Sequence, residues 1–181
     1  MLALVSILPG CAGRKITVTN LPPNVTQAQV QDWVSAANDL KQAQQITHNL
    51  QRAVMALRIA TDADGKPVLP TSVYAKALQI TARLSVAEIK FGRFLQGVPA
   101  KDFSASTKTA ALNFTNDILG LIQELNSSGI TYIKNPGTLA TINNFIAEIR
   151  AIIVVIQNFT SAALRQTIPL WGGGEIVDVH P

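Results

Sequence analysis

This 181-residue chain contains little cysteine and little charge. It has a single cysteine, which excludes a disulfide framework and a CxxC metal or redox site. Charged residues make up 14% of the chain, well below the usual quarter, and the formal net charge is only +4. Aromatic residues are also few, at 6%. These totals exclude an acidic or basic tail and argue against nucleic acid as a partner.

The residue patterns of common active sites are missing as well. With two histidines in the chain, no Ser-His-Asp or Cys-His arrangement can be nominated. Three glycines at 172–174 precede Glu175 rather than a helix with Lys-Ser/Thr, so they indicate a hinge and not a phosphate loop. The turn at Asp62 resembles part of a calcium loop, but Ala60 and Thr71 occupy its first and twelfth positions. We therefore expect no enzyme activity, no cofactor and no metal site.

Carboxylates could still form a metal site inside a helical bundle. Glu88, Glu124 and Glu148 occur one per predicted helix, but none has a histidine three residues later, as such sites usually require. Each lies beside the apolar positions of its helix, so we expect all three on solvated faces. His48 is expected at the polar surface of its helix, and His180 in a solvated tail.

What the chain does have is uncharged polarity and helical periodicity. Hydrophobic residues make up 48%, alongside 12 Gln, 11 Asn and 15 Thr, and the length suits one domain with its own core. Apolar residues recur in steps of three and four over residues 26–60, 71–96, 106–126 and 135–166. On the second stretch these residues are Val73, Ala77, Ile80, Leu84, Ala87, Phe91 and Phe94. This 3.5-residue spacing is typical of nearly parallel, closely packed helices.

Local signals mark where two of these helices begin and indicate the architecture. Thr26 with Gln29 forms a capping-box pattern, and Asn135 before Pro136 suits an N-cap followed by a first turn. Four helices joined by short loops predict an all-α fold, an antiparallel up-down-up-down four-helix bundle. We divide the chain into a signal-like segment (1–10), a linker (11–25), the bundle (26–166) and a tail (167–181). Residues 15–19 and 175–179 are short and β-like, and either pair as a small ribbon or form two disordered ends.

The N-terminus is an uncharged apolar run that ends at the only cysteine. Ten residues are too few for a membrane-spanning helix but match the apolar region of a signal peptide. Leu8, Pro9, Gly10 and Cys11 resemble the lipobox of bacterial lipoproteins, although Pro9 and the missing basic start depart from that pattern. The resemblance implies lipidation of Cys11, with cleavage before it, and a lipid-anchored domain on the periplasmic side or the cell surface. The alternative is an apolar N-terminus with an unmodified cysteine.

Two sets of side chains are candidates for binding. Lys76, Arg83 and Lys90 recur every seven residues, with Arg93 nearby, and would suit an anionic surface. The alternative is a solvated flank of the core, with Lys90 or Arg93 paired to Asp32 or Asp39 on the first helix. The second set would line a site for a small apolar ligand, or else pack as ordinary core. Its members are Trp33, Phe91, Phe94, Phe114 and Phe145.

These patterns lead to one main functional hypothesis and two alternatives. The main one is a non-catalytic structural or interaction module of the bacterial cell envelope, attached to the membrane by a lipid. Its further partner would be another protein or a second copy of the chain, because the run at residues 152–156 could widen the apolar surface. The alternatives are a bundle that binds a small apolar ligand, and a membrane-active or phage-encoded envelope protein.

Overall fold

Four long helices form the protein, which is described by a computed structural model over residues 26–62, 64–98 and 104–165. The helices are α1 (Gln27–Ala56), α2 (Thr71–Gly97), α3 (Ala105–Asn126) and α4 (Pro136–Arg165), with a 3-10 turn, η2 (Ile130–Tyr132), before α4. The signal-like segment, the linker with Cys11, both β-like segments and the tail lie outside the described residues.

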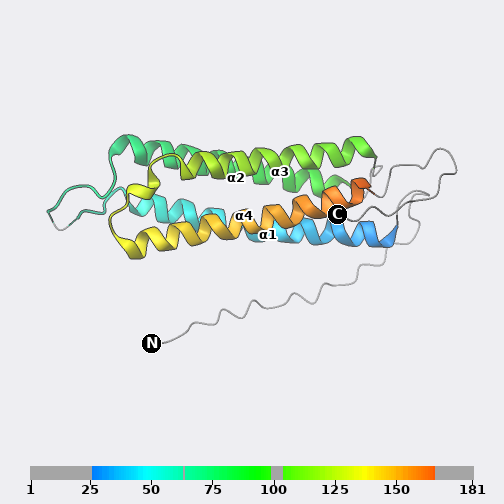
Figure 1. Ribbon diagram of the computed structural model, residues 1–181, viewed down its shortest axis with the longest axis horizontal. Coiled ribbons are helices and arrows are strands. Elements are labelled where there is room, and N and C mark those ends of the chain that lie inside the picture. Colours follow the sequence, from blue (N-terminus) through cyan, green and yellow to red (C-terminus); the bar gives the residue numbers. More distant parts are fainter. Residues whose placement is uncertain (1–25, 63, 99–103, 166–181) are drawn as a thin grey trace, which may run out of the picture.

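The helices pack as a ring of antiparallel neighbours. α1 contacts α2 and α4, and α3 contacts the same two helices from the other side. Figure 1 shows the four rods side by side, with the start of α1 and the end of α4 at one end of the bundle. A 30-residue helix such as α1 is about 45 Å long, so the bundle is elongated. The predicted all-α four-helix bundle is confirmed.

The predicted start signals lie where the helices begin. Thr26 caps α1: its hydroxyl accepts from the Gln29 backbone N–H at 3.2 Å, and its own N–H donates to the Gln29 side chain at 2.9 Å. Asn135 caps α4 by accepting from the Thr138 N–H at 3.0 Å. Both contacts satisfy backbone donors that a helix start leaves without a partner.

α1 ends four residues earlier than the periodicity indicates. Residues 57–60 lead into a short turn in which Thr61 pairs with Pro67, and the carbonyl of Ala60 accepts from the Val68 N–H at 3.0 Å. The turn closes at Gly65, whose φ of 74° lies in the left-handed region that favours glycine. The chain thus leaves the helix after Ala56 and enters this turn before it reaches Ala60.

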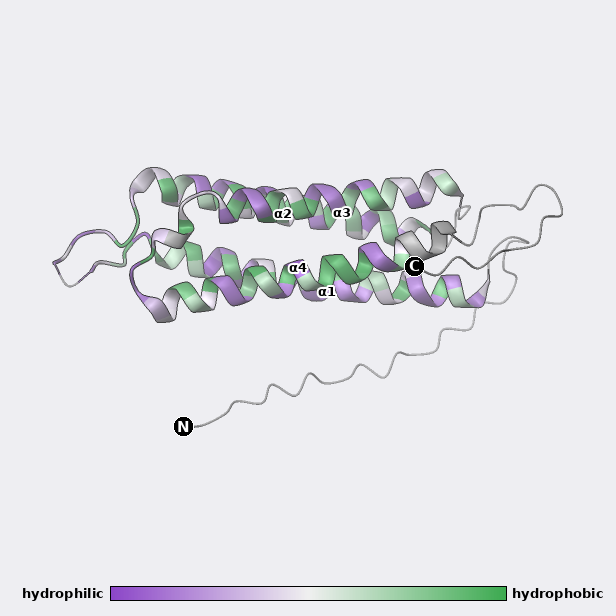
Figure 2. Cartoon of the chain, in the orientation of Figure 1, coloured by the Kyte–Doolittle hydropathy of each residue, from purple (hydrophilic) through white to green (hydrophobic). Residues whose placement is uncertain are grey.

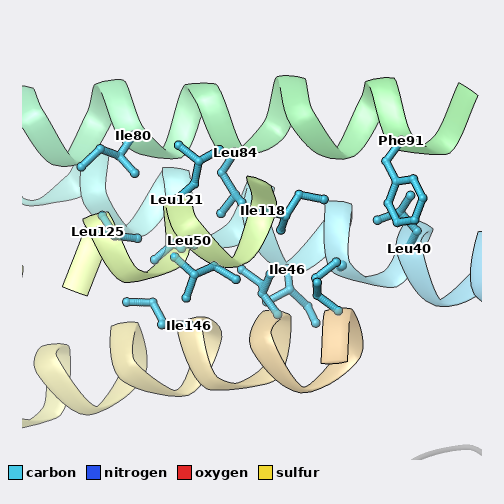
Figure 3. Close-up of a cluster of buried hydrophobic side chains, with 14 of the residues drawn as sticks. Leu40, Ile46, Leu50, Ile80, Leu84, Phe91, Ile118, Leu121, Leu125 and Ile146 are labelled. Carbon is cyan, nitrogen blue, oxygen red and sulfur yellow. The ribbon is translucent and has the colours of Figure 1, made fainter. Parts of the chain in front are cut away.

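The core follows the axis of the bundle and takes side chains from all four helices (Figure 3). Its largest fully buried members include Leu40, Leu50, Ile80, Leu84, Phe91, Ile118, Leu125, Ile142 and Ile149. Figure 2 shows hydrophobic and hydrophilic residues alternating along the helices, with a continuous hydrophobic stretch in α4. The segment Pro136–Thr160 is long and apolar enough to cross a membrane, but its isoleucines at 142, 149, 153 and 156 are fully buried against the bundle.

Candidate functional site

The most unusual side chain of the described structure is Glu88, in the middle of α2. We expected Glu88 on a solvated face, and this expectation was wrong: its side chain is 0% exposed. Helix α2 is turned so that Glu88 and Leu95 are buried, while Ala87 and Phe94 are only half-buried. The series Leu84, Glu88, Phe91, Leu95 has the same three-and-four spacing as the predicted apolar series. Periodicity could therefore have identified Glu88, but it could not choose between the two series.

Two residues of α1 hold this glutamate. The hydroxyl of Thr47, itself 0% exposed, donates to the Glu88 Oε1 atom at 2.8 Å. The Gln44 side-chain amide donates to the backbone carbonyl of Glu88 at 3.0 Å. Gly92 makes room for that amide, because a Cβ atom at this position would lie 3.2 Å from the Gln44 Nε2 atom. We call this contact of Gln44 and Thr47 with Glu88 the α1–α2 seam.

Among the described residues, the second carboxyl oxygen of Glu88 has no hydrogen-bond partner. Burial raises the pKa of Glu88 to about 7, and the Thr47 hydrogen bond opposes part of this rise. The cause is desolvation, because a charged carboxylate loses its hydration in the core. A carboxyl with such a pKa can exchange a proton near neutrality, but a fully buried group cannot reach a substrate while the seam is closed.

Among the described residues, no group of three or more His, Cys, Asp or Glu side chains lies close enough to hold a metal ion. Glu148 is exposed, as expected, and so is His48, whereas Glu124 is half-buried. Glu88 is the predicted carboxylate whose position the structure changes most, and among the described residues it is the carboxylate that lies in the core.

The basic residues Lys76, Arg83, Lys90 and Arg93 are all exposed on α2. Arg83 forms an ion pair with Glu124 of α3, with 2.9 Å between its Nη1 atom and Glu124 Oε2. Both Arg83 and Lys90 line an open groove of about 740 Å³ between α2 and α3, and Asp117 and Glu124 line it as well. The groove therefore carries charges of both signs rather than a continuous basic surface.

The anticipated pairing of Lys90 or Arg93 with Asp32 or Asp39 does not occur among the described residues. Asp39 is half-buried, and burial raises the pKa of its carboxyl. A nearby cation would lower that pKa instead. Among the described residues, the ion pair that these basic side chains form therefore joins α2 to α3 rather than to α1.

Four of the five aromatic residues named as a ligand lining come together. Phe91 stacks on Phe114 with ring centroids 5.3 Å apart, and Phe94 contacts Phe114 at 5.3 Å and Trp33 at 6.4 Å. Phe145 is half-buried and makes no ring contact within the part of the chain that is described. The cavity next to Trp33 is lined by residues of α1 and α4 rather than by the three clustered phenylalanines, and it measures about 20 Å³, which is room for about one water molecule. These rings fill the space between one another, which is the arrangement of packed core.

Comparison of the chain with protein-family models, with curated proteins and with solved structures finds no match.

Proposed function

We propose that this chain is a lipid-anchored helical bundle of the bacterial cell envelope, and that it acts as a structural or interaction module rather than as an enzyme. The observation that carries the proposal is the position of the only cysteine, Cys11, at the end of the only signal-like apolar run and directly after Gly10. Lipid chains on this residue would hold the bundle at a membrane surface, since two or more chains give a stable anchor.

The bundle itself supports a role that does not depend on catalysis. Its most perturbed carboxyl, Glu88, is sealed in the core, and the exposed ion pair of Arg83 with Glu124 is of an ordinary surface kind. The aromatic cluster is filled by its own rings. Long, exposed helix faces remain available to a partner on the outside of the bundle.

The test uses the full chain expressed in a bacterial host, with membranes separated from soluble protein. We expect the wild type in the membrane fraction, and mass spectrometry should find an N-terminal peptide that begins at Cys11 and carries acyl chains. Cys11→Ser is the matched control and should move the protein to the soluble fraction. A wild-type protein with an intact Met1 or a free Cys11 thiol would overturn the anchor.

The non-catalytic part of the proposal needs its own measurement. We expect pull-downs from envelope extract to recover the same partner with the wild type and with Glu88→Gln, because Glu88 is not on the surface. Turnover of any substrate that is lost on substitution of a single polar residue would contradict this part.

A further inference from the structure

The α1–α2 seam contains an acid that the core can accept only without charge. Glu88 is fully buried, one of its carboxyl oxygens accepts a single hydrogen bond from Thr47, and the other oxygen has no partner. A carboxylate in such a position has lost its water and has one donor to replace it. Burying an unpaired charge is among the costliest arrangements in a protein core.

No positive charge in the two helices packed against α2 compensates for Glu88. From α1, the contacts of Glu88 are the neutral Thr47 and Gln44, while the titratable Asp39, Lys41, His48 and Arg52 are exposed or half-buried. On α3, Asp117 is exposed, and Glu124 is half-buried and paired with Arg83. The buried Lys108 lies six residues before Phe114 on α3, about 9 Å of helix rise on the far side of the Phe91–Phe114 ring pair from Glu88.

The rest of the layer around Glu88 is apolar or already bonded. Leu84 and Phe91, one turn to either side on α2, are fully buried, and Ile118 of α3 is as well (Figure 3). The buried hydroxyl of Thr115 on α3 donates to the Leu112 carbonyl of its own helix at 2.8 Å. On α2 itself, Arg83, Lys90 and Arg93 point to solvent.

We propose that the α1–α2 seam is a proton-sensitive joint, which is held most firmly while the Glu88 carboxyl carries its proton and opens more readily as that proton is lost. Ionised Glu88 regains hydration only if α1 and α2 separate near Thr47, so the loss of the proton and the opening are coupled. This joint would operate whether or not Cys11 is lipidated, so it stands apart from the proposed anchor.

The direction of the pH effect follows from the raised pKa of Glu88, which is about 7 in the closed seam against an ordinary 4.5 when hydrated. Below the ordinary pKa both states hold the proton and pH has no effect. As pH rises toward 7 the open state gives up the proton and the closed state keeps it, so opening becomes more favourable. Between pH 6 and pH 8 these two pKa values correspond to an increase of about tenfold in the opening constant.

The first experiment follows the carboxyl directly. The chain has four glutamates, so ¹³C labelling of glutamate gives few carboxyl signals to resolve by NMR. We expect one signal to titrate near pH 7 and to disappear in Glu88→Gln. If the Glu88 signal titrated instead near the ordinary value of 4.5, the carboxyl would be hydrated and the joint would not exist.

The second experiment measures opening by amide hydrogen exchange of the wild type and of Glu88→Gln. Gln has nearly the same shape as Glu and no charge, so a comparison at equal pH removes the effect of pH on exchange itself. Relative to the variant, wild-type protection around Thr47 and Glu88 should fall by about tenfold from pH 6 to pH 8. Protection at the start of α4 should not change. A constant ratio, or an equal loss in all four helices, would overturn the joint.

Discussion

Replacement of Phe91 by alanine tests whether the aromatic cluster is a packed core or a ligand site. Phe91 is 0% exposed and stacks on Phe114 at 5.3 Å with an angle of 16° between the rings, and it also contacts Phe94 at 6.4 Å. A buried Phe→Ala change costs about 3–5 kcal/mol of the free energy of unfolding. Each aromatic pair contributes about 0.5–1.5 kcal/mol in addition to the free energy gained by burying its apolar surface, and this contribution is lost with the ring.

The same substitution should create a binding site that the wild type lacks. In the wild type Phe91 is 0% exposed and its own ring occupies this space, while the separate cavity next to Trp33 has only about 20 Å³, which is far too small for an aromatic molecule. Removal of the Phe91 ring leaves a space on the order of 100 Å³ with apolar walls, and engineered cavities of about this size stay dry and bind benzene. We therefore expect benzene to raise the unfolding midpoint of Phe91→Ala and to leave that of the wild type unchanged.

The assay is urea denaturation followed by helical circular dichroism at pH 5, where Glu88 is protonated. With an m-value of about 2 kcal/mol/M, a loss of about 4 kcal/mol lowers the midpoint by about 2 M. Phe159→Ala is the control: Phe159 is 42% exposed, so its loss should stay below about 1 kcal/mol. A loss below about 1.5 kcal/mol for Phe91→Ala, or stabilisation of the wild type by benzene, would refute the packed core. If Phe91→Ala does not fold, Phe91→Leu replaces it in the comparison with Phe159→Ala, and its loss of unfolding free energy should be smaller.

Two further substitutions test the polar contacts. Thr47→Val removes the one donor to the Glu88 carboxyl, and bonds to a charged acceptor are stronger than bonds to a neutral one. Stability by urea denaturation should thus fall by about 1 kcal/mol at pH 5 and about 2 kcal/mol at pH 8, and equal losses would contradict a buried titrating acid. Arg83→Ala, Glu124→Ala and the double variant form a cycle around an ion pair whose side chains are 53% and 39% exposed. The coupling energy from thermal or urea unfolding should be below about 1 kcal/mol and should shrink in high salt; a coupling above 2 kcal/mol would show that the pair organises the α2–α3 face.

The anchor and the joint act at different levels of the protein. Cys11 lies in the linker and concerns where the chain is held, whereas Glu88 concerns how firmly α1 and α2 stay together. Because the two experiments use separate variants and separate readouts, either proposal can fail while the other stands. If both hold, the chain is a surface-held bundle whose first two helices loosen as the surrounding pH rises toward 7.

The positions where two of the helices start could be read from the amino-acid sequence alone. Thr26 and Asn135 cap their helices through contacts to residues three positions away, and Pro136 already has the backbone angle of a first turn. The four-helix architecture was also predictable, because every stretch repeats its apolar residues at helical spacing. Such signals depend on neighbours in the chain, so no tertiary contact is needed to recognise them.

The burial of Glu88 and the partner of Arg83 were decided by the tertiary structure. Along α2, Ala87 and Glu88 fit the helical spacing equally well, and a rotation of the helix about its own axis selects one of them. That rotation is set by all contacts of α2 with α1 and α3 together, including the hydrogen bonds from Gln44 and Thr47 and the stacking of Phe91 on Phe114. The sequence by itself determined where helices form and which residues are apolar, whereas only the packed bundle decided which face of each helix is buried, because that choice depends on residues far apart in the chain.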